Sequence, residues 1–123
     1  MSVRRHSVTL VSAADGTGTA YSPYLSGYIE SIKYVKTDYT DGVDFTITAE
    51  ATGETLWTQV DVNAAITVYP RAGTHSTAGA PALYAAAGTV VNERIALGRD
   101  RVKIVLAQAG ATKTGAFVIT VSD

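Results

Sequence analysis

The residues best suited to chemistry in this sequence are carboxylates gathered around a glycine turn. Asp38, Asp41 and Asp44 lie close together, and Gly42 separates the last two. Calcium sites in proteins use clustered carboxylate oxygens of this kind. The spacing nevertheless lacks the D-x-D-x-D-G order and the terminal bidentate glutamate of a calcium-binding loop. We therefore predict that these aspartates shape a turn that leads into a strand, and that the chain holds no metal.

The two histidines, His6 and His75, stand apart from each other and from any further strong metal ligand in the sequence. A zinc site needs several such ligands at suitable spacing. The chain contains no cysteine, which excludes disulfides and cysteine-based metal sites. We interpret both histidines as surface residues.

No pattern of an enzyme active site is present. Glycoside hydrolysis requires two carboxyl groups at a defined separation, but the acidic residues are scattered among solvent-type positions. These are Glu30, Glu50, Glu54, Asp61 and Glu93. No G-x-S-x-G elbow occurs, and the glycines at 16 and 18 do not match a phosphate-binding G-x-G-x-x-G loop. The sequence predicts a protein without catalysis and without a cofactor.

Aromatic side chains are the remaining chemical signal. Five of the seven tyrosines fall between residues 21 and 39, and the single tryptophan is Trp57. Exposed tyrosine and tryptophan side chains stack on sugars or anchor protein interfaces. Tyr21, Tyr24, Tyr28 and Trp57 would form the platform of a carbohydrate-binding or receptor-binding domain. The alternative interpretation is that they lie at the edge of the core.

Length and composition favour one folded domain covering residues 1–123. The chain is 46% hydrophobic and 17% charged, with a net charge of -1 and no block of like charges, which is typical of a globular protein. A near-neutral chain lacks the basic face that tracks a phosphate backbone, so we expect no nucleic-acid partner. No segment has the length and apolar character of a signal peptide or of a membrane span. We expect no membrane partner and assembly in the cytoplasm.

The elements that position these residues are strands. From Val43 to Glu50, apolar and polar residues alternate strictly after the Asp-Gly turn. Because side chains alternate across a strand with period two, one face of this strand is predicted to be buried and the other solvated. Such strands belong to antiparallel sheets that pack on one side. Similar signals predict strands at 8–11, 19–24, 28–36, 55–60, 65–69, 89–95, 101–107 and 116–121.

This series of short strands predicts an all-β antiparallel sandwich, jelly-roll-like, with an immunoglobulin-like sandwich as the alternative. The best helix candidate is the short stretch 81–87, where alanine favours helix. Two segments break the strand rhythm. Residues 71–88 are predicted to form a long loop that is functional or that orders against a partner. Residues 1–7 are predicted to form an extended N-terminal arm.

Several stretches of the chain resemble small structural proteins of tailed bacteriophages and prophages. They are IKYVK at 32–36, DGVDFTIT at 41–48, ETLW at 54–57, YPRA at 69–72, LYAA at 83–86 and RVKIV at 101–105. Proteins that look like this are head-associated virion components, and the nearest role is a capsid cement, or decoration, protein. Known cement proteins of this size are often β-sandwich or jelly-roll trimers over junctions between major capsid subunits. The resemblance transfers no functional residue.

The resemblance implies a homo-oligomer, with a trimer favoured, that binds the major capsid protein on the capsid surface of a virion assembled in the host cytoplasm. The contacting regions are expected to be 3–6 and 71–88. The candidate partner-binding residues within them are Arg4, Arg5, His6, Arg71, His75 and Tyr84. The alternatives are the carbohydrate- or receptor-binding domain described above and a structural component of the phage tail or neck.

Overall fold

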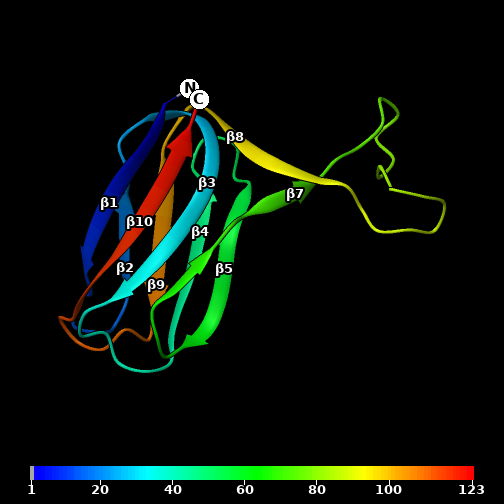
Figure 1. Cartoon of the computed structure of the whole chain (residues 1–123). Coiled ribbons are helices and arrows are strands. Elements are labelled where there is room, and N and C mark those ends of the chain that lie inside the picture. Colours follow the sequence, from blue (N-terminus) through cyan, green and yellow to red (C-terminus); the bar gives the residue numbers. More distant parts are fainter. Residues whose placement is uncertain (1) are drawn as a thin grey trace.

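The computed structural model describes residues 2–123, which form ten β-strands and no helix in two packed antiparallel sheets (Figure 1). One sheet has the order β1-β10-β3-β8-β7, with β6 also paired to β3, and the other has the order β2-β9-β4-β5. The strands are β1 (Val3–Val11), β2 (Gly18–Tyr21), β3 (Leu25–Lys36), β4 (Val43–Ala49), β5 (Thr55–Val62), β6 (Ile66–Val68), β7 (Arg71–Gly73), β8 (Asn92–Asp100), β9 (Val102–Ala107) and β10 (Thr114–Ser122). Among these residues no helix is present that could cross a membrane.

The strand pairing is that of a jelly roll. β1 pairs with β10, β2 with β9, β3 with β8 and β4 with β5, all antiparallel. In this nested arrangement, successive strand pairs of one long antiparallel hairpin alternate between the two sheets. β6 and β7 are additions within the connection from β5 to β8. The predicted jelly-roll-like sandwich is therefore confirmed, and the order differs from the ABED and CFG sheets of an immunoglobulin fold.

Alternating burial along the strands produces the core. In β4 the side chains of Val43, Phe45, Ile47 and Ala49 are buried, while the residues between them face outward. Burial of each of the three larger side chains, Val43, Phe45 and Ile47, contributes about 1.5–3 kcal/mol. The same alternation in β10 buries Phe117, and the rings of Phe45 and Phe117 meet edge to face at 5.1 Å. The two sheets are thus joined through one hydrophobic core.

Two sequence-based predictions about local structure are wrong. Residues 3–7 do not form a free arm, because they lie within β1 and pair with residues 118–122 of β10. Met1 lies outside the described residues. The stretch 81–87 forms no helix, since it contains a bridge from Leu83 to Val90 and a turn closed by the N–H of Gly88 on the carbonyl of Ala85. The strand expected at 89–95 begins at Asn92 and continues to Asp100.

The predicted loop 71–88 is in part a strand, because its first three residues form β7. Residues 74–91, which we call the arm, connect β7 to β8. Figure 1 shows the arm reaching away from the sandwich, beyond the ends of both strands. The start of β1 and the end of β10 lie side by side at the same end of the sandwich, where the N–H of Asp123 donates to the carbonyl of Ser2. The sandwich thus presents one long projection.

Candidate interaction surfaces

The arm has no buried side chain. Every residue from Arg71 to Arg94 is at least partly exposed, and burial resumes only at Ile95. Large apolar side chains are among the exposed ones: 74% of Tyr84 and 41% of Leu83 are accessible to solvent. An exposed group of apolar side chains on a projecting segment is typical of a surface that binds another molecule.

The backbone of the arm is nevertheless ordered by its own hydrogen bonds. The N–H of Thr74 donates to the carbonyl of Val91 at 2.8 Å, and the N–H of Val91 donates to the carbonyl of Ala82 at 2.9 Å. The N–H of Ala82 donates in turn to the carbonyl of Thr74 at 2.9 Å. Three short segments of the arm are thereby held side by side. The exposed side chains are consequently presented from a defined backbone.

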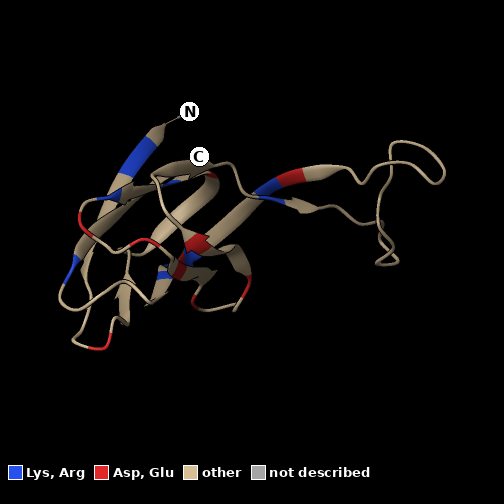
Figure 2. Cartoon of the chain, turned by 90° about the horizontal axis from the view of Figure 1, so that it is seen from below, with Lys and Arg blue, Asp and Glu red and all other residues tan. Residues whose placement is uncertain are grey.

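The arm carries no charge. Arg71 and Glu93 flank a stretch that contains no Asp, Glu, Lys or Arg, and His75 is its one titratable side chain apart from Tyr84. Figure 2 shows charged residues at the base of the projection and none beyond it. The rest of the chain carries charges of both signs on its surface. An uncharged apolar projection therefore extends from a charged body.

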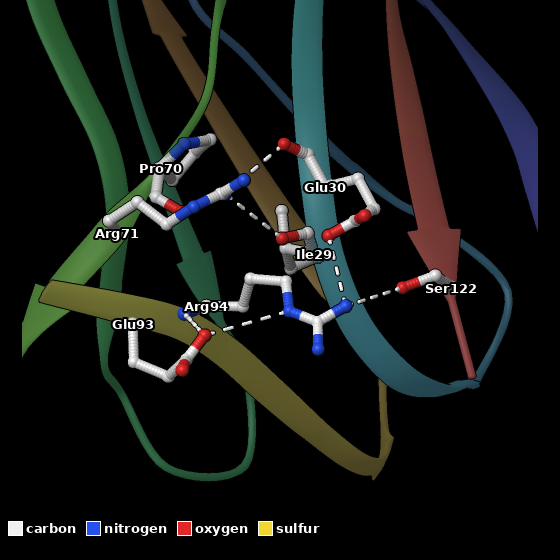
Figure 3. Close-up of polar contacts among 7 residues, drawn as sticks. All are labelled: Ile29, Glu30, Pro70, Arg71, Glu93, Arg94 and Ser122. Carbon is white, nitrogen blue, oxygen red and sulfur yellow. Dashed lines mark hydrogen bonds and ion pairs between the residues drawn. The ribbon is translucent and has the colours of Figure 1, made fainter.

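Arg94 connects the base of the arm to the sandwich (Figure 3). Its Nη1 lies 3.2 Å from the Oγ of buried Ser122 and 3.4 Å from Oε1 of Glu30. Its guanidinium also lies 4.4 Å from the ring centroid of Tyr28, and its Nε is 3.6 Å from Glu93. The backbone N–H of Arg94 is the main reason that the pKa of Glu93 lies below its ordinary value. These contacts fix the direction in which β8 leaves the sheet.

Arg71 acts at the same place through backbone acceptors. Its Nη1 donates to the carbonyl of Pro70 at 2.8 Å and to that of Glu30 at 3.2 Å, with the carbonyl of Ile29 at 3.4 Å (Figure 3). The residue was predicted as a partner-binding cation. The structure places its guanidinium against the body of the same chain, where it holds β7 beside β3.

The other two candidates from the predicted loop lie on the arm itself. His75 stands near its start, exposed, in a bridge with Pro81. Tyr84 lies beside Leu83, and its backbone N–H donates to the carbonyl of Thr89 at 3.1 Å. Both side chains belong to the uncharged projection. Both residues were selected because the stretch 71–88 lacks the alternation of a strand, and both lie on the arm.

The second surface is the open edge of β1. In the part of the chain that the structure describes, β1 pairs with β10 on one side and with no strand on the other. A long unpaired strand edge is a template on which another chain can add a strand. A shallow depression beside the start of β1 is lined by Val3, Arg4, Arg5 and Thr120. β1 therefore offers both backbone and side-chain groups to a partner.

The three candidates on β1 differ in their surroundings. Arg4 is engaged within the chain, because its Nη1 lies 3.0 Å from the carboxylate of Asp123 and its Nη2 lies 3.2 Å from the carbonyl of Ser26. His6 is half-buried, and its Nε2 is enclosed without a hydrogen-bond partner among residues 2–123. Arg5 is exposed and makes no ion pair with the described residues. Arg5 is therefore the cation of this edge that a partner can reach.

The six candidates do not form one site. β1 is at one end of the strand order of its sheet, and β7, from which the arm starts, is at the other end. Arg4, Arg5 and His6 therefore lie apart from His75 and Tyr84. The structure separates them into two surfaces on opposite edges of one sheet.

The predicted aromatic platform is wrong. Trp57 is 9% exposed, packs edge to face on Phe45 at 4.7 Å, and donates its Nε1–H to Gln59 at 3.0 Å. A buried ring cannot stack on a sugar. Tyr28 lies beneath Arg94, at the base of the arm. Trp57 and Tyr28 therefore lie in environments that differ from each other and from that of Tyr21 and Tyr24.

Tyr21 and Tyr24 flank a guanidinium that the sequence did not single out as a binding group. Arg101 lies 4.0 Å from the ring centroid of Tyr21 and 5.4 Å from that of Tyr24. It also makes two hydrogen bonds to the carboxylate of Glu50, at 2.6 and 3.0 Å. These bonds hold the pKa of Glu50 below its ordinary value. The group is a cation–π and ion-pair cluster, in which Arg101 between β8 and β9 contacts Tyr21 at the end of β2, Tyr24 in the β2–β3 connection and Glu50 just after β4.

The clustered aspartates serve as hydrogen-bond acceptors around turns. Asp44 accepts from the backbone N–H of Asp61 at 2.8 Å and from the side chain of Gln108 at 3.0 Å. Asp38 accepts from the N–H of Thr114, and Asp41 pairs with Lys36. Within residues 2–123, no three His, Asp or Glu side chains form a metal-binding group. The aspartates thus connect the turns at one end of the sandwich.

No model of a known protein family matches the sequence, and no curated protein sequence matches it. Two solved structures are similar in shape. The crystal structure of FLHE aligns over 100% of both chains with 6% identity and a TM-score of 0.47. The cryo-EM structure of a virus-like particle of the giant freshwater prawn Macrobrachium rosenbergii extra small virus aligns over 98% of this chain and 79% of that chain, with 12% identity and a TM-score of 0.32. At TM-scores below 0.5, neither likeness assigns a family or a function.

Proposed function

We propose that this chain is a non-enzymatic structural protein of a phage virion, which binds the outside of the head and joins neighbouring major capsid protein subunits. The supporting observation is that two open surfaces, the β1 edge and the arm, lie at opposite edges of one sheet. A protein that bridges subunits needs at least two contact surfaces on one stiff body. The resemblance of the sequence to cement proteins of phage heads agrees with this arrangement.

The stiffness of the body follows from its core. The ring of Phe45 in one sheet contacts the rings of Tyr34 and Phe117, which are neighbours in the other sheet, and the three centroid distances are 5.1–5.4 Å. Close packing of this kind transmits force with little deformation. Packaged DNA pushes the shell outward, so a stiff bridge across a subunit junction opposes separation. Several modest contacts per bridge then act together through effective concentration.

The β1 edge is the proposed attachment to the capsid. A capsid strand can pair with the open backbone of β1, while Arg5 in the neighbouring depression binds a carboxylate of the capsid protein. Backbone pairing supplies affinity, and the cation sets the position of the partner along the strand. The arm remains available for a second contact.

Binding to purified heads that lack the protein tests this function. We expect saturable, stoichiometric binding, measured by co-sedimentation and by added density in cryo-EM. Arg5→Glu is expected to weaken binding by at least about tenfold, since a like charge then faces the partner's carboxylate. Lys103→Glu, the same charge change on β9 of the other sheet, is the matched control and is expected to bind normally.

Two results would overturn the proposal. A chain that never binds such heads at any concentration has no cement function. Specific binding to isolated tails, with none to heads, would assign it to the tail or neck. Equal loss of binding in both charge variants would remove β1 as the attachment surface.

A further inference from the structure

The arm exposes apolar side chains that its own chain does not cover. From Arg71 to Arg94 no side chain is buried, although Leu83, Tyr84 and Val90 are large and apolar. Soluble monomers rarely expose contiguous apolar surface beyond a few hundred Å², and larger patches mark contacts with other molecules. The hydrogen bonds among Thr74, Ala82 and Val91 hold these side chains in place before any contact forms. Less conformational entropy is therefore lost when a partner binds.

The lack of charge on the arm indicates which partner fits. When two copies of a surface meet about a symmetry axis, each charge near the axis faces an identical charge. A surface with charged residues must avoid this repulsion by compensating pairs. Residues 72–92 contain no Asp, Glu, Lys or Arg, so the arm can face its own copy without repulsion.

The other long uncharged stretch of the chain does not share this property. Residues 16–29 also lack charged side chains, but cations from elsewhere in the fold cover their tyrosines. Arg101 lies over Tyr21 and Arg94 lies over Tyr28. Tyr84 on the arm has no arginine or lysine over its ring among the described residues. The arm therefore combines exposed apolar side chains with freedom from charge.

We infer that the partner of the arm is the arm of a second copy of this chain, with Leu83, Tyr84 and Val90 forming an apolar contact between copies. The clamp of Arg71 and Arg94 at the base sets the angle between each arm and its sandwich. The β1 edges then point away from the contact, since β1 lies at the opposite edge of the sheet. The inference goes beyond the proposed function, because association of the free protein does not involve a capsid.

A charge-exchange experiment on the full chain tests the arm-to-arm contact. Leu83→Asp and Leu83→Lys are made separately, and association is measured by sedimentation equilibrium over a range of concentrations. The original protein is expected to associate. Each variant alone is expected to associate at least about tenfold more weakly, since identical charges meet. An equimolar mixture of the two is expected to recover association, because opposite charges then meet across the contact.

Matched controls separate this effect from misfolding. Val60→Asp places the same charge at a valine that is 70% exposed on β5, in the other sheet, and is expected to leave association unchanged. Each variant must keep the circular dichroism and melting of the original protein. Should Leu83 variants unfold, the pair Tyr84→Asp and Tyr84→Lys replaces them, because Tyr84 is the most exposed large apolar side chain of the arm.

Three outcomes would overturn the inference. The original protein could stay monomeric at every concentration, or the single variants could associate as strongly as it does. Association that both variants weaken and that the mixture fails to restore would show that the arm contacts a different surface. None of these measurements uses capsids, so they leave the proposed function standing. Normal association of the free protein without binding to heads would support the arm-to-arm contact and contradict the proposed function.

Discussion

Two buried tyrosines in the core differ in what their hydroxyl groups contact. The hydroxyl of Tyr39 donates to the carbonyl of Leu10, whereas the hydroxyl of Tyr34 has no hydrogen-bond partner among residues 2–123. Both rings are buried and stack at a centroid distance of 6.2 Å. A buried hydroxyl without a partner loses its hydrogen bonds to water and forms none in the protein, which lowers the stability of the folded state. Similar rings in one core therefore contribute differently to stability.

Replacing each tyrosine by phenylalanine should reveal this difference. Tyr39→Phe removes a buried hydrogen bond and is expected to lower the free energy of unfolding by about 1–2 kcal/mol. Tyr34→Phe removes an unsatisfied group and is expected to leave the free energy of unfolding unchanged or raise it by up to about 1 kcal/mol. Urea unfolding monitored by fluorescence provides the measurement. Equal destabilisation by both substitutions would contradict the structural assignment.

The same residues predict how stability depends on pH. Burial, with a smaller contribution from the charge of Asp41, raises the pKa of Tyr34 from 10.0 to about 12. Burial also raises the pKa of Tyr39. The unfolded chain therefore loses these protons at lower pH than the folded chain does. The stability from the neutral hydroxyls is fully present below about pH 10 and is lost as the pH rises through the folded pKa values.

The test compares the free energy of unfolding at about pH 9 and about pH 11.5. We expect a decrease for the original protein and a smaller decrease for Tyr34→Phe. Tyr69→Phe is the control, because Tyr69 is exposed and lies outside the arm. A decrease of the same size in all three proteins would show that Tyr34 does not carry the effect.

At the scale of elements, the junction of β3, β7 and β8 determines how the arm is held. Ser122 is fully buried, and its hydroxyl is within 3.2 Å of the Arg94 guanidinium. The ion pair between Arg94 and Glu30 is partly exposed and adds little by itself. The arrangement matters because one side chain links β8, β3 and β10 at the point where β8 turns away from the sheet.

Arg94→Ala should loosen this junction. The substitution removes the partner of a buried hydroxyl, so we expect a loss of about 1–2 kcal/mol in the free energy of unfolding. Hydrogen exchange is expected to accelerate in residues 71–73 and 92–94, where β7 pairs with β8. Arg99→Ala, also on β8 but without a side-chain hydrogen bond or ion pair among the described residues, should change stability by no more than about 0.5 kcal/mol. Unchanged exchange in Arg94→Ala would show that Arg71 alone suffices.

At the scale of the whole molecule, the sandwich and the arm have separate tasks. The buried core cluster has no member between 74 and 91, so the arm contributes no buried side chain to the core that stabilises a single chain. The arm instead carries exposed apolar side chains at a distance from the body. Stability and interaction are thereby assigned to different parts of one chain.

Removing the arm should therefore leave the sandwich folded. Gly73 and Asn92 are paired across β7 and β8, so an Asn-Gly turn can replace residues 74–91 as a two-residue hairpin connection. At protein concentrations too low for association, the free energy of unfolding is expected to change by no more than about 1 kcal/mol. Calorimetry and chemical unfolding measure this change. A much larger loss would show that the arm stabilises the monomer.

Gly115→Ala serves as the positive control for this comparison. A Cβ at Gly115 would overlap the ring of Tyr39, so the substitution is expected to destabilise the sandwich by about 1–3 kcal/mol. The same assay should therefore detect damage to the core while showing little effect of the deletion.

Much of the fold could be predicted because strand burial is a local pattern. The alternation from Val43 to Glu50 predicted β4, which ends at Ala49. The apolar alternation at 116–121 predicted β10. The pattern failed for residues 3–7 of β1, where polar side chains occupy an edge strand. That strand is held by backbone pairing with β10. Such pairing does not require a pattern of apolar and polar side chains, so the sequence does not reveal it.

The candidate surfaces could be predicted only in part. His75 and Tyr84 were identified because residues 71–88 lack periodicity, and both lie on the arm. The contacts of Arg71 could not be predicted, because its acceptors on β3 are backbone carbonyls that lie far away in the sequence. The burial of Trp57 was missed because a register shift opposite it breaks the alternation of β5, so that the consecutive residues Leu56 and Trp57 are both buried.

The sequence by itself determined a cysteine-free, nearly neutral, all-β chain with an uncharged segment between Arg71 and Glu93. These are properties of composition and of local alternation, which each stretch of chain carries alone. Only the tertiary structure decided the jelly-roll order, the separation of β1 from the arm, and the projection of that segment into solvent. The physical reason is that strand partners and exposed edges depend on which distant segments hydrogen-bond, and that choice is made by the whole chain as it buries one core.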